Sequence, residues 1–127
     1  MTEPAFSLQP AHPGDLPALL MLEQSSFSGD RLNARQFRYH MGHKRNRLLV
    51  AKINGTVVGA ALVFLRKGSD LARLYSIAVD ARARGRGLGT ALLQAAEQAA
   101  FTAGARRLRL EVRSDNSAAI ALYARRG

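Results

Sequence analysis

The segment that most constrains the fold is RLLVAKINGTVVGAALVFLR, residues 47–66, in which two β-rich runs flank Asn54-Gly55. Asn-Gly between two such runs is the strongest short signal for a two-residue β-hairpin, because its tight turn needs a positive φ at both residues. A third run, LARLYSIAV at residues 71–79, follows the turn KGSD and is apolar enough to be a central strand. The sequence therefore predicts a sheet built around this hairpin.

Strands and helices alternate on either side of these runs. Strands are predicted for AFSLQPA (5–11) and ARRLRLEV (105–112), and helices for HPGDLPALLMLEQSSF (12–27), NARQFRYHMGH (33–43), LGTALLQAAEQAAFTAG (88–104) and NSAAIALYARRG (116–127). Asp15 and Asn33 are the predicted N-caps of the first two helices, and Gly104 the C-cap of the long one. Antiparallel strands followed by a strand–helix–strand crossover predict a mixed, mostly antiparallel α/β sheet with helices on both faces.

The composition limits the classes of protein and of site. The 127 residues suffice for one domain, and the absence of cysteine excludes disulfides, thiolate metal sites and a cysteine nucleophile. No signal peptide or bilayer-length apolar run is visible, so we expect a soluble cytoplasmic protein. His40 and His43 have no carboxylate near them in sequence, which favours a solvated helix face over a metal site.

The chain is strongly basic, with a formal net charge of +10. Between residues 31 and 52 there are seven basic residues and no acidic one. Such a surface attracts polyanions, which include nucleic acid, a ribosome or a small phosphorylated ligand. The alternative is a chain that uses arginine as a general surface residue.

The loop RARGRGLGTALL, residues 82–93, connects the third run to the long helix. The first N–H groups of a helix have no internal partners, glycines let a ligand approach the backbone, and arginines add charge, so the loop predicts a phosphate or pyrophosphate site. A Walker A loop is excluded because no lysine is present. A dinucleotide fingerprint fails because Thr90 and Leu92 stand where its last glycine is needed. The spacing is Arg84-x-x-Gly87-x-Gly89.

This spacing resembles the Gln/Arg-x-x-Gly-x-Gly/Ala signature of the GNAT superfamily of N-acetyltransferases. SIAVDARARGRGLGTALLQAAEQAA (76–100) looks like the strand–loop–helix unit of that family that holds the pyrophosphate of acetyl-CoA. LRLEVRSDNSAAIALYARRG (108–127) looks like its second motif, with Asn116 and Tyr123 at the typical spacing. This second half is most similar to the branch that acetylates the N-terminal alanine of a ribosomal protein. The resemblance implies the GNAT fold, with a parallel pair of strands that splay apart.

The resemblance also implies which residues bind acetyl-CoA. The pyrophosphate is expected on Gly85, Arg86, Gly87, Leu88, Gly89 and Thr90, and on Arg84, whose guanidinium either contacts phosphate or braces the loop. The pantetheine arm is expected on the backbone of Ile77, Ala78 and Val79 and on Asn116. Arg82 and Arg86 are expected to face solvent or the adenosine phosphate. Ile77 and Val79 also fit a plain core strand, and Asn116 also fits an N-cap.

Two residues are the implied catalytic groups. Glu111 ends the strand LRLEV, and by alternation it faces away from Leu110 and Val112. In the ribosomal-protein branch a glutamate here is the general base that deprotonates the incoming amine. The alternative is a strand-end glutamate paired with a neighbouring arginine. The phenol of Tyr123 is the implied acid that protonates the leaving thiolate, or else an aromatic that packs the last helix.

The implied activity is transfer of acetyl from acetyl-CoA to a primary amine, expected at a protein or peptide N-terminus, ribosomal proteins included, without a metal. One alternative is an acyl-CoA-binding GNAT-like domain of a larger protein with little catalysis of its own. A nucleic-acid-binding module is less favoured, because aromatic residues make up only 6% of the chain. Family members continue past Tyr-x-x-x-Gly with two further strands, so we expect residues 1–127 to be a single GNAT domain truncated at its C-terminal end.

Overall fold

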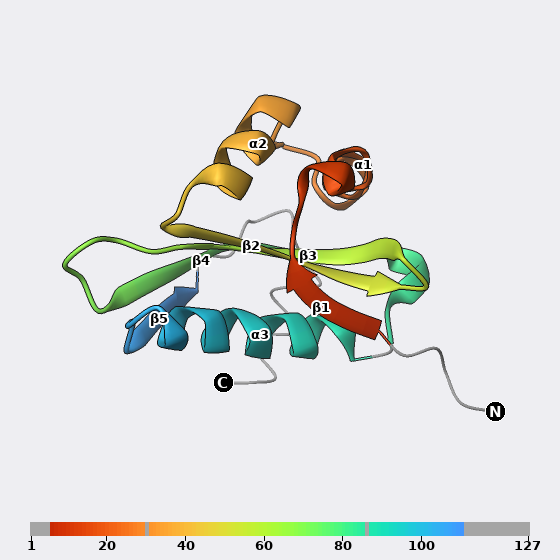
Figure 1. The fold of residues 1–127 in the computed structure, drawn as a ribbon. Helices are drawn as coiled ribbons and strands as arrows, with labels where there is room; N and C mark the ends of the chain where they lie inside the picture. Colours follow the sequence, from red (N-terminus) through yellow and green to blue (C-terminus); the bar gives the residue numbers. More distant parts are fainter. Residues whose placement is uncertain (1–5, 30, 86, 111–127) are drawn as a thin grey trace.

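The computed structural model of the chain describes residues 6–29, 31–85 and 87–110. Its elements are β1 (Phe6–Pro10), η1 (Pro13–Asp15), α1 (Leu16–Ser26), α2 (Ala34–Gly42), β2 (Asn46–Ile53), β3 (Thr56–Phe64), β4 (Leu71–Val79), η2 (Ala81–Ala83), α3 (Leu88–Thr102) and β5 (Arg107–Leu110). The five strands form one sheet in the order β1-β2-β3-β4-β5 (Figure 1). The first four strands pair antiparallel and β5 joins β4 in parallel, as the sequence predicts.

The β2–β3 hairpin forms at the predicted turn. Asn54 has φ 51° and Gly55 has φ 79°, which is the left-handed pair that a two-residue turn requires. Ile53 lies opposite Thr56 at the closed end of the hairpin, and Asn46 lies opposite Phe64 at its open end. Residues 59–63 in the middle of β3 are all buried, because both faces of the sheet are covered.

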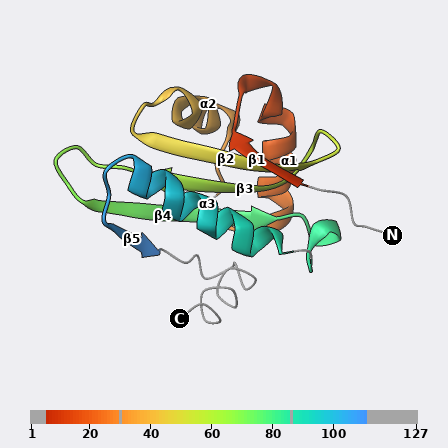
Figure 2. The ribbon, with the colours of Figure 1, turned by 60° about the horizontal axis from the view of Figure 1, so that its bottom comes forward.

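The sheet is the middle of three layers, with α1 and α2 on one face and α3 on the other (Figure 1). Buried side chains on the α3 face include Val63, Leu74, Ile77, Leu88, Leu92, Leu93 and Ala96. Those on the α1 and α2 face include Leu19, Leu22, Phe27, Phe37, Leu48, Val50 and Leu62. Figure 2 shows α3 running along the sheet from the end of β4 back to the start of β5, which makes the parallel crossover.

The helix ends are largely where the sequence predicts them. Asn33 caps α2 through a capping box, because its side chain accepts from the Gln36 N–H at 2.9 Å and the Gln36 side chain accepts from the Asn33 N–H at 2.9 Å. Helix α3 ends at Thr102 with Ala103 as its C-cap, so Gly104, the predicted C-cap, lies one residue further on, where it has a left-handed φ of 100°. Strand β5 is described for four residues of the longer run that was predicted. None of the described helices is long and apolar enough to cross a membrane.

The predicted N-cap role of Asp15 is corrected by the structure. Asp15 stands at the N-cap position of α1 but makes no side-chain cap bond to that helix. Its carboxylate instead accepts from the His12 N–H at 3.0 Å and faces the ammonium of Lys52. The short η1 turn in front of α1, which begins at Pro13, redirects this side chain toward the sheet.

Candidate acyl-CoA site

The site is built on the last residues of β4. The side chains of Ile77 and Val79 pack with the α3 face of the core, while Ala78 packs with the α1 and α2 face. The parallel register of β4 with β5 covers Leu71–Leu74, and its antiparallel register with β3 continues to Val79. The side chains of Ile77 and Ala78 are buried and that of Val79 is half-buried, so the backbone is the main part of this segment that a ligand could contact.

The turn after β4 is fixed by Asp80. Its N–H donates to the Val58 carbonyl at 2.8 Å, and its Oδ1 accepts from the Arg82 N–H at 2.9 Å, which caps η2. The Arg82 guanidinium donates to the same carboxylate at 3.2 and 2.9 Å. These hydrogen bonds hold the pKa of Asp80 below its ordinary value and raise the pKa of Arg82. Arg82, expected on solvent or phosphate, is exposed and bound to Asp80 in this structure.

The loop between η2 and α3 turns at two glycines. Gly85 has φ 84° and Gly87 has φ 78°, and no atom lies within 4 Å of the position that a Cβ would take at either residue. Arg84 is exposed at the start of this loop. The loop therefore holds two residues with a left-handed backbone, which favours glycine, and there is free space beside each of them.

Helix α3 begins directly at this loop. Its N-cap is Gly87, which has no side chain to cap the helix, and its first turn contains no acidic residue. Leu88 is buried in the core, so only its backbone faces the loop, while Gly89 and Thr90 are half-buried. Fifteen residues of aligned peptide dipoles and the uncapped N–H groups of the first turn make this end of α3 suited to an anion.

The remaining predicted site residues lie outside the described residues. These are Arg86, Glu111, Asn116 and Tyr123. Two further residues shape the site, although no sequence motif marks them. Asp80 fixes the turn, and an acidic residue before a helical turn is a cap signal. Gly59 on β3 lies opposite Val79 on β4. A glycine inside a strand often marks a place where another segment of the chain comes close.

The histidines take part in local structure. His12 Nδ1 accepts from the Gly14 N–H at 3.0 Å and His43 Nδ1 accepts from the Arg45 N–H at 3.2 Å. His40 is half-buried rather than solvated as predicted, because its ring lies 5.2 Å from that of Phe64 and bonds to the Asn46 amide at 2.9 Å. Burial, and then the neighbouring His43, lower the pKa of His40. Within the described ranges there is no group of three or more metal-ligating side chains.

The fold and the loop together define a class, namely mixed α/β proteins that present an arginine-glycine loop at the start of the crossover helix. Comparison with known proteins gives the family. The chain belongs to the acetyltransferase (GNAT) family, whose model matches residues 16–127. This confirms the family and the fold that the two motifs predict.

Individual relatives are consistent with this assignment. The chain is 37% identical over 109 residues to the ribosomal protein bS18-alanine N-acetyltransferase of Salmonella typhimurium, a match that covers 86% of this chain and 71% of that protein. It is 35% identical over 85 residues to an acetyltransferase of Yersinia pestis, covering 65% of this chain. That match spans only 57% of the length of the Yersinia protein. The crystal structure of the Escherichia coli ribosomal-protein-S18-alanine N-acetyltransferase superimposes with a TM-score of 0.79 at 31% identity, over 97% of this chain and 77% of that one.

Proposed function

We propose that the protein transfers the acetyl group of acetyl-CoA to a primary amine at the N-terminus of a protein or peptide in the cytoplasm. The observation that carries the proposal is the open loop at the start of α3, with left-handed glycines at 85 and 87 and no acidic side chain in the first turn of the helix. This local structure suits a pyrophosphate, and acetyl-CoA is the general acyl donor of the family.

In this proposal the loop and the helix start bind the pyrophosphate of acetyl-CoA. The N–H groups of residues 85–90 donate to its oxygens, and Arg84 adds charge from the exposed side of the loop. Arg86 stands within the same loop in the sequence. The pantetheine arm pairs with the backbone of Ile77–Val79, whose side chains are already used in the core. Asn116 is the proposed side-chain ligand of that arm.

Catalysis is proposed to be direct transfer. Glu111 follows the last residue of β5 in sequence and takes a proton from the incoming ammonium, because a protonated amine cannot attack a thioester. The free amine attacks the acetyl carbonyl, and the Val79 N–H stabilises the oxyanion. The carbon–sulfur bond then breaks, and Tyr123 gives its proton to the departing thiolate. The nitrogen, which carries a positive charge after the attack, loses its remaining extra proton, and this proton restores the phenol of Tyr123. The products are the acetylated amine and free CoA.

The acceptor that we propose is an N-terminal alanine, as in a ribosomal protein. It is supported by the relative from Salmonella typhimurium, whose name states that activity. Its test is a set of peptides that share one sequence and differ in the first residue. Alanine should give the highest kcat/KM, and a peptide blocked at its N-terminus but carrying a lysine should give none. Equal rates on the blocked peptide would move the proposal to lysine side chains.

The test of the cofactor half is calorimetric titration of the purified chain with acetyl-CoA, with ATP and NAD as controls. Selective binding of acetyl-CoA is expected, because the loop fits a pyrophosphate and the β4 backbone fits the arm. Equal binding of ATP would reduce the site to a general phosphate site. A folded chain that binds none of the three ligands would overturn the proposal.

The test of catalysis is release of free CoA thiol, which is simple to measure here because the chain contains no cysteine. Glu111→Gln and Tyr123→Phe should each lower kcat by about 10²–10⁴-fold while the affinity for acetyl-CoA stays unchanged. If acetyl-CoA binds but the wild-type chain releases thiol no faster than the variants, the chain is an acyl-CoA-binding domain and not an enzyme.

A further inference from the structure

One end of the sheet brings together basic residues from separate parts of the chain. This end is formed by the start of β2, the turn between β3 and β4 and the start of β5, and it lies opposite to η2 and the start of α3 (Figure 1). Backbone hydrogen bonds join the three parts. The Leu65 N–H donates to the Arg45 carbonyl at 2.8 Å, and the Arg106 N–H donates to the Asp70 carbonyl at 2.8 Å. The start of β2, the turn and the start of β5 therefore lie side by side.

Five cations lie on the first two of these segments. We call them the basic rim, which consists of Lys44, Arg45, Arg47, Arg66 and Lys67. Lys44, Arg66 and Lys67 are exposed, and the other two are half-buried. The Arg47 guanidinium donates to the carbonyls of Lys44 and Asn46, which holds its charge over the turn before β2. Three of the five belong to the acid-free stretch 31–52, and the antiparallel pairing of β2 with β3 adds the other two.

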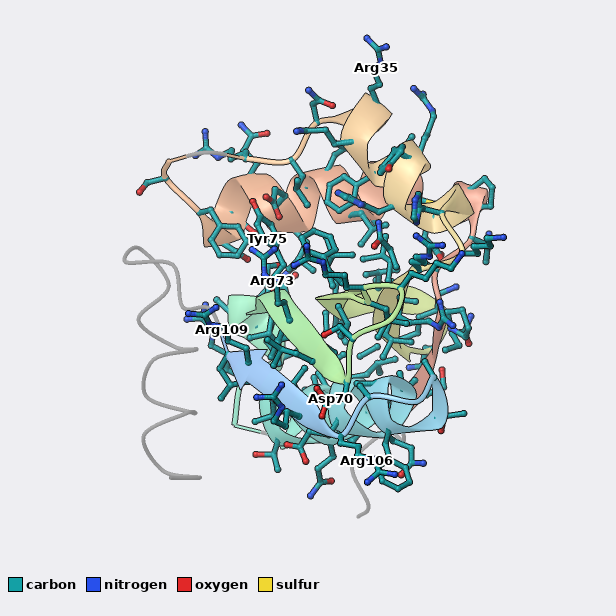
Figure 3. All side chains as sticks on the ribbon, turned by 90° about the vertical axis from the view of Figure 1, so that its left-hand side faces the viewer. Arg35, Asp70, Arg73, Tyr75, Arg106 and Arg109 are labelled. Carbon is teal, nitrogen blue, oxygen red and sulfur yellow. The ribbon has the colours of Figure 1, made fainter. Side chains whose placement is uncertain are left out.

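Carboxylates compensate little of this charge. Among the residues that the structure describes, none forms an ion pair with a member of the basic rim. The acidic side chain of the turn is Asp70, and Figure 3, which looks onto this end of the molecule, shows it with Arg106 below it. The Arg107 guanidinium binds the Asp70 carboxylate at 2.8 Å, and Arg106 adds a second positive charge near it. This end of the sheet is therefore strongly cationic.

The residue types around the basic rim select among anionic partners. The segments 44–47 and 65–69 contain no aromatic residue, and their one aliphatic residue, Leu65, is half-buried. A specific protein interface has an apolar centre, and a membrane-binding surface inserts apolar side chains, so this surface suits neither partner. A phosphate backbone requires cations and hydrogen-bond donors, which arginine and lysine supply.

We infer that the basic rim binds the phosphate backbone of a nucleic-acid duplex. A duplex keeps its bases inside and carries about one negative charge per 1.7 Å of its axis, so cations on two neighbouring strands about 5 Å apart can contact several phosphates at once. A single strand would gain from exposed rings on which its bases stack, and the rim segments supply none. Because the rim and the loop before α3 lie at opposite ends of the sheet, this binding does not depend on acetyl transfer (Figure 1).

The experiment is fluorescence anisotropy of a labelled sixteen-base-pair duplex, prepared as RNA and as DNA of the same sequence and titrated with the full chain between 50 and 300 mM KCl. The slope of log K against log [KCl] should be about −0.9 for each phosphate contact, and so about −3 to −5 for the basic rim. Lys44→Ala and Lys67→Ala should each make the slope less steep by about 0.9, an about eightfold loss of affinity at 0.1 M KCl when counted from 1 M salt. Lys67→Arg keeps the charge and should bind as the wild type does. The duplex that binds more tightly identifies the natural class of nucleic acid.

Arg82→Ala is the matched control, because it removes the same charge from an exposed side chain at the other end of the sheet and should leave duplex binding unchanged. Tyr39→Ala, which removes an exposed ring from α2, should leave it unchanged too. Circular dichroism of each variant establishes that it is folded. Four results would overturn the inference: no binding of either duplex at 50 mM KCl, equal weakening by Arg82→Ala and Lys67→Ala, displacement of the duplex by acetyl-CoA, or tighter binding of oligouridine or polyglutamate than of either duplex. The second result would reduce the binding to the net charge of the chain, and the third would place the duplex on the loop before α3.

Discussion

The ammonium Nζ of Lys52 lies 2.9 Å from Oδ1 of Asp15, and the two side chains are only 13% and 6% exposed. Asp15 stands at the start of α1 and Lys52 on β2, so this ion pair joins a helix of the outer layer to the sheet. The carboxylate also accepts from the His12 N–H. A buried pair of this kind contributes little compared with apolar packing, but removing one partner leaves a charge without compensation.

Asp15→Asn is expected to lower the free energy of unfolding by about 3 kcal/mol at pH 7, because it leaves the Lys52 ammonium without its carboxylate in a nearly closed site. Lys52→Met should cost a similar amount, and the double variant less than the two costs added together. Urea unfolding measures all three. The matched control is Asp70→Asn, which breaks the exposed pair with Arg107 and should cost less than about 1 kcal/mol. Equal costs at the two sites would show that burial of the Asp15 pair has no energetic role.

The same pair predicts a pH dependence. Burial acts to raise the pKa of Asp15, but the His12 N–H and Lys52 outweigh it and hold that pKa below its ordinary value. A carboxyl whose pKa is lowered by folding stabilises the fold above its unfolded pKa of about 3.9, and this stability is lost as the pH falls through the folded pKa. The free energy of unfolding should therefore fall below about pH 4, and less steeply in Asp15→Asn. Asp70 and Asp80 have lowered pKa values too, and they contribute to the pH dependence of both proteins. The contribution of Asp15 is therefore the difference between the curve of unfolding free energy against pH for the wild type and the same curve for Asp15→Asn.

Much of the fold follows from local signals in the sequence. Asn54-Gly55 predicts the hairpin because its turn needs positive φ at both residues, and β4 is found at the bounds of the run that predicts it. The Asp15–Lys52 pair is not predicted, because a short 3-10 turn redirects a side chain that local rules assign to a helix cap. The half-buried state of His40 is missed for a related reason, since it depends on Phe64, which the fold brings beside it.

The candidate site, like the fold, could be predicted only where the sequence carries a local signal. The glycines of the loop have a local requirement, namely a left-handed backbone, and so their spacing in the sequence is informative. Gly59 has a requirement that is not local. A Cβ at this residue would lie 2.8 Å from Leu92 Cδ1 and 3.1 Å from the Ala78 carbonyl oxygen, which belong to α3 and β4. Only the packed structure shows that contact.

Gly59→Ala is therefore expected to push α3 and β4 away from β3. The Leu92 side chain can rotate, but the backbone oxygen of Ala78 cannot yield alone, so the cost should be about 1–3 kcal/mol in urea unfolding. The affinity for acetyl-CoA should fall as well, because Ala78 lies in the segment proposed to carry the pantetheine arm. Gly59→Ala with Leu92→Val relieves only the side-chain contact and should recover less than half of the lost stability. Full recovery would show that β4 is not displaced.

Gly87→Ala should weaken acetyl-CoA binding at least tenfold while causing no clash in the free protein. Its Cβ would meet no atom within 4 Å, so the cost comes from the left-handed backbone and should be about 1–2 kcal/mol. Gly42→Ala is the matched control. Gly42 is the exposed last residue of α2, also with open space around it, and alanine there should leave binding unchanged and stability equal or higher. Calorimetry and urea unfolding distinguish the two sites, and equal binding by Gly87→Ala would mean that the loop does not hold the ligand.

Gly89→Glu should abolish acetyl-CoA binding in a chain that is at least as stable as the wild type. Residue 89 lies in the first turn of α3, where glutamate is favoured over glycine by helix propensity and by the helix dipole, together about 1 kcal/mol. The same carboxylate would repel a pyrophosphate at the same N–H groups. Stability should thus rise or stay equal while binding is lost. An unfolded or distorted variant would instead lose both stability and binding.

The control for this last change is Gln98→Glu, which adds the same charge to an exposed position further along α3. It should keep the wild-type affinity, because the new carboxylate lies two to three turns from the loop. Thermal unfolding and calorimetry with acetyl-CoA are measured on both variants at one salt concentration. If Gly89→Glu binds as Gln98→Glu does, the pyrophosphate does not sit at the start of α3, and the arginines and glycines of residues 82–89 serve the turn alone.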